Sequence, residues 1–220
     1  GGASYMRVDA DDDWSSDDET DEDDDADETP DDEIDGNNWV IADVSESELG
    51  IKFQYPYFFN GDVTSGRLFL NEEGAFAAAA SDSNINYGTY SEDLDAGTLT
   101  FTFDDTDDTF VVFVEDNGAV LKSEEGEILI CVAAQFLPDK NGEYPDAYYN
   151  HPIPPNSYYY LNGDPNAHSL FFYDISALSL KSSGDDEEKI AYYSINGDVM
   201  KIGEMESFDG FELTIDDGGK

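Results

Sequence analysis

The feature that most constrains the fold is a series of short strand-like runs joined by tight-turn dipeptides. Asn-Gly occurs five times, beginning at positions 60, 117, 141, 162 and 196, and it accepts the positive φ angles of two-residue hairpin turns. Aromatic and β-branched runs such as RLFL, TFVVFVE and EILICVAA stand between the turns. In TLTFTF, Leu99, Phe101 and Phe103 alternate with threonines, as in a half-buried strand. The sequence therefore predicts an all-β fold of antiparallel meanders.

Helical signals are scarce. Residues 45–48, Ser-Glu-Ser-Glu, could open one short helix through a capping box. Residues 75–80, AFAAAA, have helical propensity. Neither segment continues with a 3.6-residue period, so we expect both to be local exceptions in a β protein.

One hairpin signature occurs twice, 102 positions apart. In each copy aromatic residues lead into Asn-Gly-Asp, five variable residues follow, and Leu-Phe comes next, at Leu68 and Leu170. The second copy has no counterpart of AVLKSEEGEILICVAA, residues 119–134. We therefore expect a duplication in which the second module is either shorter or completed by strands from the first half of the chain.

These observations predict three regions. Residues 1–37 form a disordered acidic leader or stalk, residues 38–136 a first β module, and residues 137–220 a linker and a second β module. The two modules are related antiparallel meanders, each a small barrel or half-barrel, and the sequence leaves open whether they are separate units or one composite domain.

Charge excludes some partners. The chain has 53 acidic and 9 basic residues and a net charge of −44. Such a surface repels phosphate backbones and anionic membranes, so nucleic acid is not an expected partner. Residues 36–220 alone contain 35 acidic and 8 basic residues. Because self-repulsion opposes folding, we expect either a setting where cations screen the charge or a simple solubility device.

The leader is the most acidic segment, since 18 of the 27 residues from Asp9 to Asp35 are Asp or Glu. Dense like charge with little apolar surface predicts an extended, disordered stalk. Asp9, Asp11 and Asp13 match the first positions of an EF-hand loop. Trp14 then stands where the loop needs Gly, and Thr20 where it needs a bidentate Glu, so loose cation condensation is the expected behaviour.

Compartment signals are sparse. Cys131 is the single cysteine and lies in an apolar run, which predicts a buried core thiol. No run reaches the roughly 18 apolar residues that a membrane-spanning helix needs. The start, GGASYMRV, lacks a basic and apolar signal region. We expect a processed or trimmed end, and a lipid anchor upstream would fit an extracellular, surface-anchored protein.

The turn and strand chemistry resembles the lipocalin-like small β-barrel modules of bacterial secreted and surface lipoproteins. The matching residues are Leu68 to Leu70, Gly74 to Phe76, Gly88 to Tyr90 and Gly97 to Thr100, about a third of the chain with their connections. The second copy departs from the pattern at Ala191, where Gly-Thr is missing. The resemblance implies an all-β barrel and an extracytoplasmic setting, and it implies no particular ligand.

Two tyrosine-rich runs are the candidate ligand-binding segments. They contain Tyr55 and Tyr57, then Tyr148, Tyr149, Tyr158, Tyr159 and Tyr160. Such rings can stack on sugars or line a peptide groove. The alternative is that they fill β cores, because alternation turns at least half of them inward.

An acidic turn is the candidate metal site. Asp104, Asp105, Asp107 and Asp108 fall between two strong strands and could offer oxygen ligands to calcium. Residues 185–188, Asp-Asp-Glu-Glu, form a similar cluster. The alternative is a solvated hairpin tip that blocks edge pairing. No cofactor is expected apart from this calcium.

Catalytic signatures are missing. The two histidines, His151 and His168, fall in predicted loops, and no nucleophile elbow, zinc-binding or phosphate-loop motif occurs. We therefore expect a non-enzymatic binding or structural module on a bacterial surface, with a glycan, peptide or small apolar molecule as ligand. The alternatives are a calcium- or salt-dependent structural domain without organic ligand and a glycosidase-like enzyme.

Overall fold

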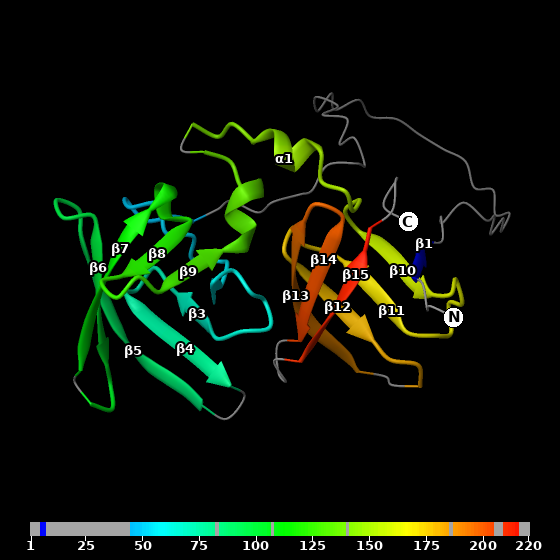
Figure 1. Cartoon of the computed structure of the whole chain (residues 1–220), viewed down its shortest axis with the longest axis horizontal. Coiled ribbons are helices and arrows are strands. Elements are labelled where there is room, and N and C mark those ends of the chain that lie inside the picture. The colour runs from blue at the N-terminus through cyan, green and yellow to red at the C-terminus, as the bar shows by residue number, and fades with distance from the viewer. Residues whose placement is uncertain are drawn as a thin grey trace, which may run out of the picture.

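The computed structural model describes residues 5–7, 45–81, 84–106, 108–139, 141–184, 187–204 and 209–215. It shows two bodies of antiparallel strands side by side (Figure 1). The predicted all-β meander fold is confirmed. The described helical segments are short: η1 (Asp116–Gly118), η2 (Val132–Phe136) and α1 (Asp146–Tyr149). None of the helices in the described part of the chain has the length and apolarity to span a membrane.

The first body is a closed barrel of eight strands in sequence order. Its strands are β2 (Tyr57–Phe59), β3 (Arg67–Leu70), β4 (Ala75–Ser81), β5 (Asn84–Asp93), β6 (Thr98–Phe103), β7 (Thr109–Glu115), β8 (Val120–Ser123) and β9 (Ile128–Cys131). The barrel closes because β9 pairs with β2, with Cys131 opposite Tyr57. The AFAAAA run lies in β4, because pairing with β3 and β5 overrides its helical propensity.

The second body is a seven-stranded sheet that curls into an open half-barrel (Figure 1). Its strands are, in spatial order, β1 (Tyr5–Arg7), β10 (Ser157–Leu161), β11 (Ser169–Phe172), β12 (Ala177–Lys181), β13 (Glu188–Asn196), β14 (Val199–Glu204) and β15 (Gly210–Thr214). The prediction of an unstructured leader is wrong for Tyr5–Arg7, which pairs with β10. The rest of the leader lies outside the described residues.

The two bodies share their strand registers. Tyr57 pairs with Leu68 in the barrel, and Tyr159 pairs with Leu170 in the half-barrel, each 102 positions later. Phe101 faces Phe110 and Ile202 faces Phe211, with an offset of 101. The correspondence runs through β2–β7 and β10–β15. Descent of both bodies from one duplicated unit stays a prediction.

The repeated turns have the same backbone conformation. Asn60 and Asn162 have φ of 52° and 54°, and the glycines that follow have φ of 71° and 72°. These positive angles are the ones that Asn-Gly accepts with little strain. The turn chemistry therefore sets the same hairpin at both places.

Aromatic rings pack the interior of the closed barrel. The Phe101 ring lies 4.7 Å from that of Phe110, 5.2 Å from that of Phe76 and 6.0 Å from that of Tyr90, centroid to centroid. The half-barrel core is built in the same way, with Phe172 5.2 Å from Tyr193. Eight-stranded barrels are just wide enough for side chains to fill, and here rings occupy that space.

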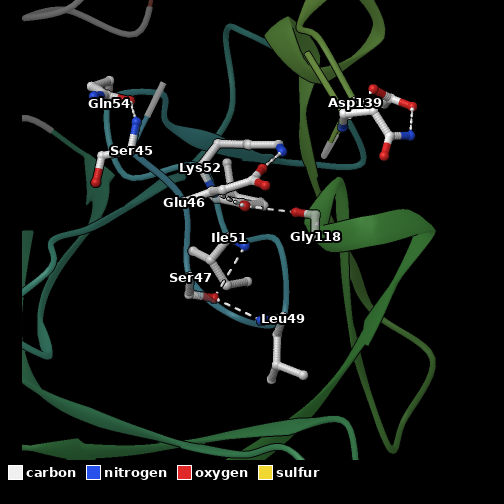
Figure 2. Close-up of polar contacts among 11 residues, drawn as sticks. Ser45, Glu46, Ser47, Leu49, Ile51, Lys52, Gln54, Gly118 and Asp139 are labelled. Atoms are coloured by element: carbon white, nitrogen blue, oxygen red, sulfur yellow. Dashed lines mark hydrogen bonds and ion pairs between the residues drawn. The ribbon is translucent and has the colours of Figure 1, made fainter. Parts of the chain in front are cut away.

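Residues 45–48 do not form the helix that their capping-box pattern could open. They form a turn in which Glu46 pairs with Lys52 as an isolated β-bridge. The Ser47 side chain accepts hydrogen bonds from the backbone N–H groups of Leu49 and Ile51 (Figure 2). The serine thus stabilises a tight turn, since Ser competes well for local backbone donors outside helices.

Candidate functional site

The two bodies touch through an aromatic and cationic contact centred on Tyr192 of β13. The Tyr192 ring lies 5.5 Å from the Phe58 ring in an edge-to-face arrangement and 6.4 Å from the Phe69 ring. The Arg67 guanidinium lies 5.7 Å from the Tyr192 centroid, and its Nη2 donates to the carbonyl oxygen of Glu204 at 3.2 Å. These contacts hold the outer face of β13 and β14 against β2 and β3.

Backbone approaches backbone beside this contact. A Cβ on Gly203 would lie 2.2 Å from the Val63 carbonyl oxygen, so no side chain fits there. Lys201 Nζ lies 2.7 Å from Asp62 Oδ2. Asp62 Oδ1 also accepts from the Thr64 backbone at 2.9 Å and from its hydroxyl at 2.7 Å. The hairpin after β2 is thereby fixed to β14.

A groove of about 810 Å³ runs along this contact. Its apolar walls come from β9 and η2 on one side and from β13 and β14 on the other. They include Ile130, Val132 and Ala134, and opposite them Ile195 and Val199. Pockets of about 300 to 1,000 Å³ between domains are the usual place for small ligands, so this groove is the candidate functional site.

Polar groups line the same groove at a few points. They are Gln135 of η2 together with Ser194, Asn196, Lys201 and Glu212 of the half-barrel. Gln135 Nε2 donates to the Val132 carbonyl at 3.2 Å, and Lys201 is engaged by Asp62. An apolar groove with a few amide, hydroxyl and charged groups can orient a ligand that is partly apolar and partly polar.

Cys131 also borders the groove. The residue is only 2% exposed and belongs to the core, as the sequence predicts. Burial raises the pKa of the thiol to about 12. The protonated thiol is neither a good nucleophile nor a good metal ligand. This cysteine therefore contributes shape to the groove and no reactivity.

Polar contacts connect the segment before β2 with η1 (Figure 2). Lys52 is 3% exposed and forms an ion pair with Glu46. The Tyr57 hydroxyl accepts from the Lys52 backbone N–H at 3.1 Å and donates to the Gly118 carbonyl at 2.6 Å. A second hollow of about 480 Å³ borders Lys52 and shares Ala119, Ala134 and Gln135 with the groove.

The candidate tyrosines are divided between core and surface. Tyr57, Tyr159, Tyr148 and Tyr55 are buried, with exposed fractions of 0%, 4%, 7% and 8%. Both bonds of the Tyr57 hydroxyl are internal, and burial raises its pKa. Tyr149 and Tyr158 are 63% and 43% exposed, and Tyr160 is half-buried. Four of these seven rings therefore serve the cores, and none of the seven lines the groove.

The exposed rings contact other aromatic rings in two places. Tyr158 stacks on Phe171 of the neighbouring strand at 4.3 Å and lies parallel to Tyr160 at 6.1 Å. Near α1, Tyr144 lies 4.2 Å from Tyr148, and Tyr148 lies 5.2 Å from Tyr149. Because these ring pairs contact one another, part of their surface is already used in packing.

The acidic turn between β6 and β7 is exposed at Asp104, Asp105 and Asp108, and Asp107 lies outside the described residues. Asp185 and Asp186 of the second acidic cluster lie outside them as well. Among the residues that the structure describes, no three His, Cys, Asp or Glu side chains lie close enough to hold a metal ion. Calcium binding at the turn stays a prediction.

The two histidines differ. His168 is exposed in the β10–β11 loop, as predicted. His151 also lies in a loop, but its ring packs 4.7 Å from the Phe136 ring and 6.1 Å from the Tyr193 ring. Burial lowers the pKa of His151, which favours a neutral ring in the core. Tyr193 and Ile153 hold it by hydrogen-bond contacts.

No protein-family model, curated protein or solved structure matches this chain. Function is therefore inferred from the geometry. Sequence reasoning missed the groove because its walls come from segments about 60 to 70 residues apart, such as Val132 and Ile195. Gly203 packs beside the groove, but its correspondence with Thr102 follows from the strand registers and not from the sequence.

Proposed function

We propose that this chain is a non-enzymatic binding module that holds a small, partly apolar ligand or a short peptide segment between its two bodies. The observation that carries this proposal is the groove of about 810 Å³ with apolar walls and a few polar groups. The proposal also places the chain outside the cytoplasm on a bacterial surface, because the net charge of −44 is best screened where cations are abundant.

The eight-stranded barrel is compatible with the lipocalin-like modules that the sequence resembles, and membership of that group is part of the proposal. Barrels of that kind can hold one small ligand inside. Here Phe76, Phe101 and Phe110 occupy the interior, which favours a site outside the barrel. The ligand is expected to be neutral or cationic, since the acidic surface repels anions.

Two features favour binding over catalysis at this groove. The Cys131 thiol is protonated by virtue of its raised pKa of about 12. Glu212 is the one carboxylate among the described groove-lining residues, whereas glycoside hydrolysis normally uses a pair of carboxylates facing the substrate. A ligand would therefore be held and released unchanged.

A neutral solvatochromic dye, Nile red, tests the groove. Its fluorescence should rise with the wild-type chain and fall several-fold when Trp fills the groove from either wall, in Ala134→Trp or Ser194→Trp. Val111→Trp, at a 38% exposed position of β7, is the matched control and should bind dye as wild type does. Equal dye binding by all variants, with unchanged thermal melting, would remove the groove from consideration.

A structural role dependent on cations is the second candidate, and the ring-filled barrel interior favours it. Thermal melting with calcium and with sodium chloride at equal ionic strength separates the two cations. A calcium-specific rise in Tm that disappears in a triple Asp→Asn variant at 104, 105 and 108 supports the acidic turn as a site. An equal effect of both salts supports simple charge screening.

A further inference from the structure

The short strand β1 occupies the place in the half-barrel that β9 occupies in the closed barrel. In the barrel, Leu129, Ile130 and Cys131 pair with Phe59, Phe58 and Tyr57. In the half-barrel, Tyr5, Met6 and Arg7 pair with Leu161, Tyr160 and Tyr159, which stand 102 positions after those three partners. Direction and register are therefore the same, although β1 comes from the opposite end of the chain.

With β1 in this place, the described strands of the half-barrel fill seven of the eight strand positions of the closed barrel. In the described part of the chain, no strand stands at the position of β8, which in the barrel pairs with β7 on one side and β9 on the other, antiparallel to both. Within the described residues, β15 and β1 are the two edge strands of the sheet. The curl of the sheet brings these edges toward the same side of the body (Figure 1).

Burial differs between the two bodies at the position where the described half-barrel has no counterpart of β8. Val112 of β7 is 2% exposed in the closed barrel, where it pairs with Ser123 of β8. Leu213 of β15, its counterpart 101 positions later, is only half-buried although it faces the core. A strand at the β8 position would cover Leu213 and pair the outer edge of β15.

We infer that the gap between β15 and β1 accepts one extended peptide strand from a basic partner, antiparallel to both edges. The chain's own β8 shows what such a strand needs: four residues, with Leu121 facing the core at 1% exposure. By the same register, the occupant's apolar residue would stand opposite Ile215 and Tyr5, which replace Val114 and Leu129. Main-chain pairing supplies affinity, and this side chain supplies selectivity.

Charge favours a basic occupant. Lys122 of β8 points outward and lies 3.6 Å from Glu115. In the half-barrel the edge strand β15 carries Glu212, and Asp209 directly precedes this strand in the sequence. With a net charge of −44 on each chain, a second copy of the protein is repelled at low salt, whereas a segment with lysine or arginine is attracted.

The test uses the full chain and a capped synthetic peptide, Ala-Val-Leu-Lys-Ser, which copies residues 119–123. Amide hydrogen exchange of residues 210–215 is followed by NMR at increasing peptide concentration. Saturating peptide should slow exchange about tenfold along β15, and added salt should weaken the effect. Amides of β7 in the closed barrel, already paired with β8, serve as the internal control and should not change.

A second peptide with Asp in place of the central Leu, and the protein variant Leu213→Asp, should both abolish the protection. Protection by both peptides alike, or by neither, overturns the inference. Slow exchange in the free protein at every concentration would mean that another segment of this chain fills the gap, and protection that grows with protein concentration would mean a second copy. The Nile red variants at Ala134 and Ser194 change residues outside β15, so they test the groove separately from this result.

Discussion

The closed barrel and the half-barrel use the same hairpins and end differently. Over six strands, residues that pair in one body have counterparts that pair in the other. The barrel then closes with β8 and β9, its next strands in sequence, whereas the half-barrel takes β1 from about 150 residues earlier. Strand register is thus set locally by turns and alternation. How each sheet ends depends on which strand from elsewhere in the chain pairs with its edge.

Matched positions show how contact between the bodies changes the residue required. Thr102 of β6 and Gly203 of β14 are counterparts, since each pairs at the same step of its hairpin. Thr102 is half-buried, whereas Gly203 is buried because the Val63 carbonyl of the other body lies against it. The position that packs against the other body therefore carries no side chain, whereas its counterpart in the barrel carries one.

The largest expected effect comes from opening a cavity in the closed barrel. Phe101→Ala removes a fully buried ring that packs on Phe76, Tyr90 and Phe110, and it should lower the free energy of unfolding by about 3–5 kcal/mol. Urea denaturation followed by tyrosine fluorescence measures it. Phe113→Ala, at a 42% exposed site, is the control and should stay within about 0.5 kcal/mol of wild type.

A cavity at the matching position of the half-barrel tests whether the two bodies unfold together. Ile202→Ala, at the counterpart of Phe101, should cost about 2–5 kcal/mol. Because one cluster of buried residues includes side chains of both bodies, a single shared transition is expected in each variant. Two separate transitions, only one of which moves, would show that the bodies unfold independently.

The next effect is at the contact between the bodies. Gly203→Thr places in the half-barrel the residue that the barrel carries at Thr102, and its Cβ would overlap the Val63 carbonyl oxygen. We expect a loss of about 1–3 kcal/mol and a larger radius of gyration in solution scattering. The reverse change, Thr102→Gly, should cost only about 0.5–1 kcal/mol, with no change in radius. An unchanged radius in Gly203→Thr would contradict close packing of the two bodies.

A smaller effect is expected from removing β1. Deletion of residues 1–7 takes away three strand pairs with β10 and should cost about 1–2 kcal/mol. Amide exchange should accelerate at residues 159–161 and stay unchanged at residues 57–59, which β9 covers. If the deletion left the exchange rates of residues 159–161 unchanged, β1 would not protect β10 in the way that β9 protects β2.

The smallest effect concerns the ion pair between Lys201 and Asp62. Burial raises the pKa of Asp62, but hydrogen bonds from Lys201 and Thr64 outweigh it, so the pKa lies below its usual value. The stabilisation is therefore complete above the usual carboxyl pKa of about 3.9 and is lost as the pH falls through the lower folded value.

Lys201→Met should cost less than about 1 kcal/mol at pH 7, because both side chains are about a third exposed. In pH-dependent melting, the difference from wild type should shrink toward zero as the pH falls below the usual carboxyl pKa of about 3.9 and through the lower folded value. Lys122→Met, which removes a looser pair at 3.6 Å, is the control. A difference that grows at low pH would reverse the assigned sign.

The sequence predicted part of the chemistry of the candidate site. Cys131 as a core thiol followed from its apolar neighbours, and it is buried. The tyrosine runs were read as binding platforms or as core, and alternation explains why Tyr57 and Tyr159 turn inward while Tyr158 turns outward. Which exposed ring meets a ligand could not follow from alternation, because it depends on what packs against each outer face.

Local sequence patterns predicted the hairpin turns and most of the strands, with Tyr5–Arg7 and the AFAAAA run as exceptions. Asn-Gly accepts positive φ, and period-two alternation assigns each residue to a face, so both hairpin sets form alike. Only the tertiary structure decided that β9 closes one body, that β1 takes its place in the other, and that a groove opens between them. Those outcomes depend on contacts between residues far apart in the chain, which local patterns do not encode.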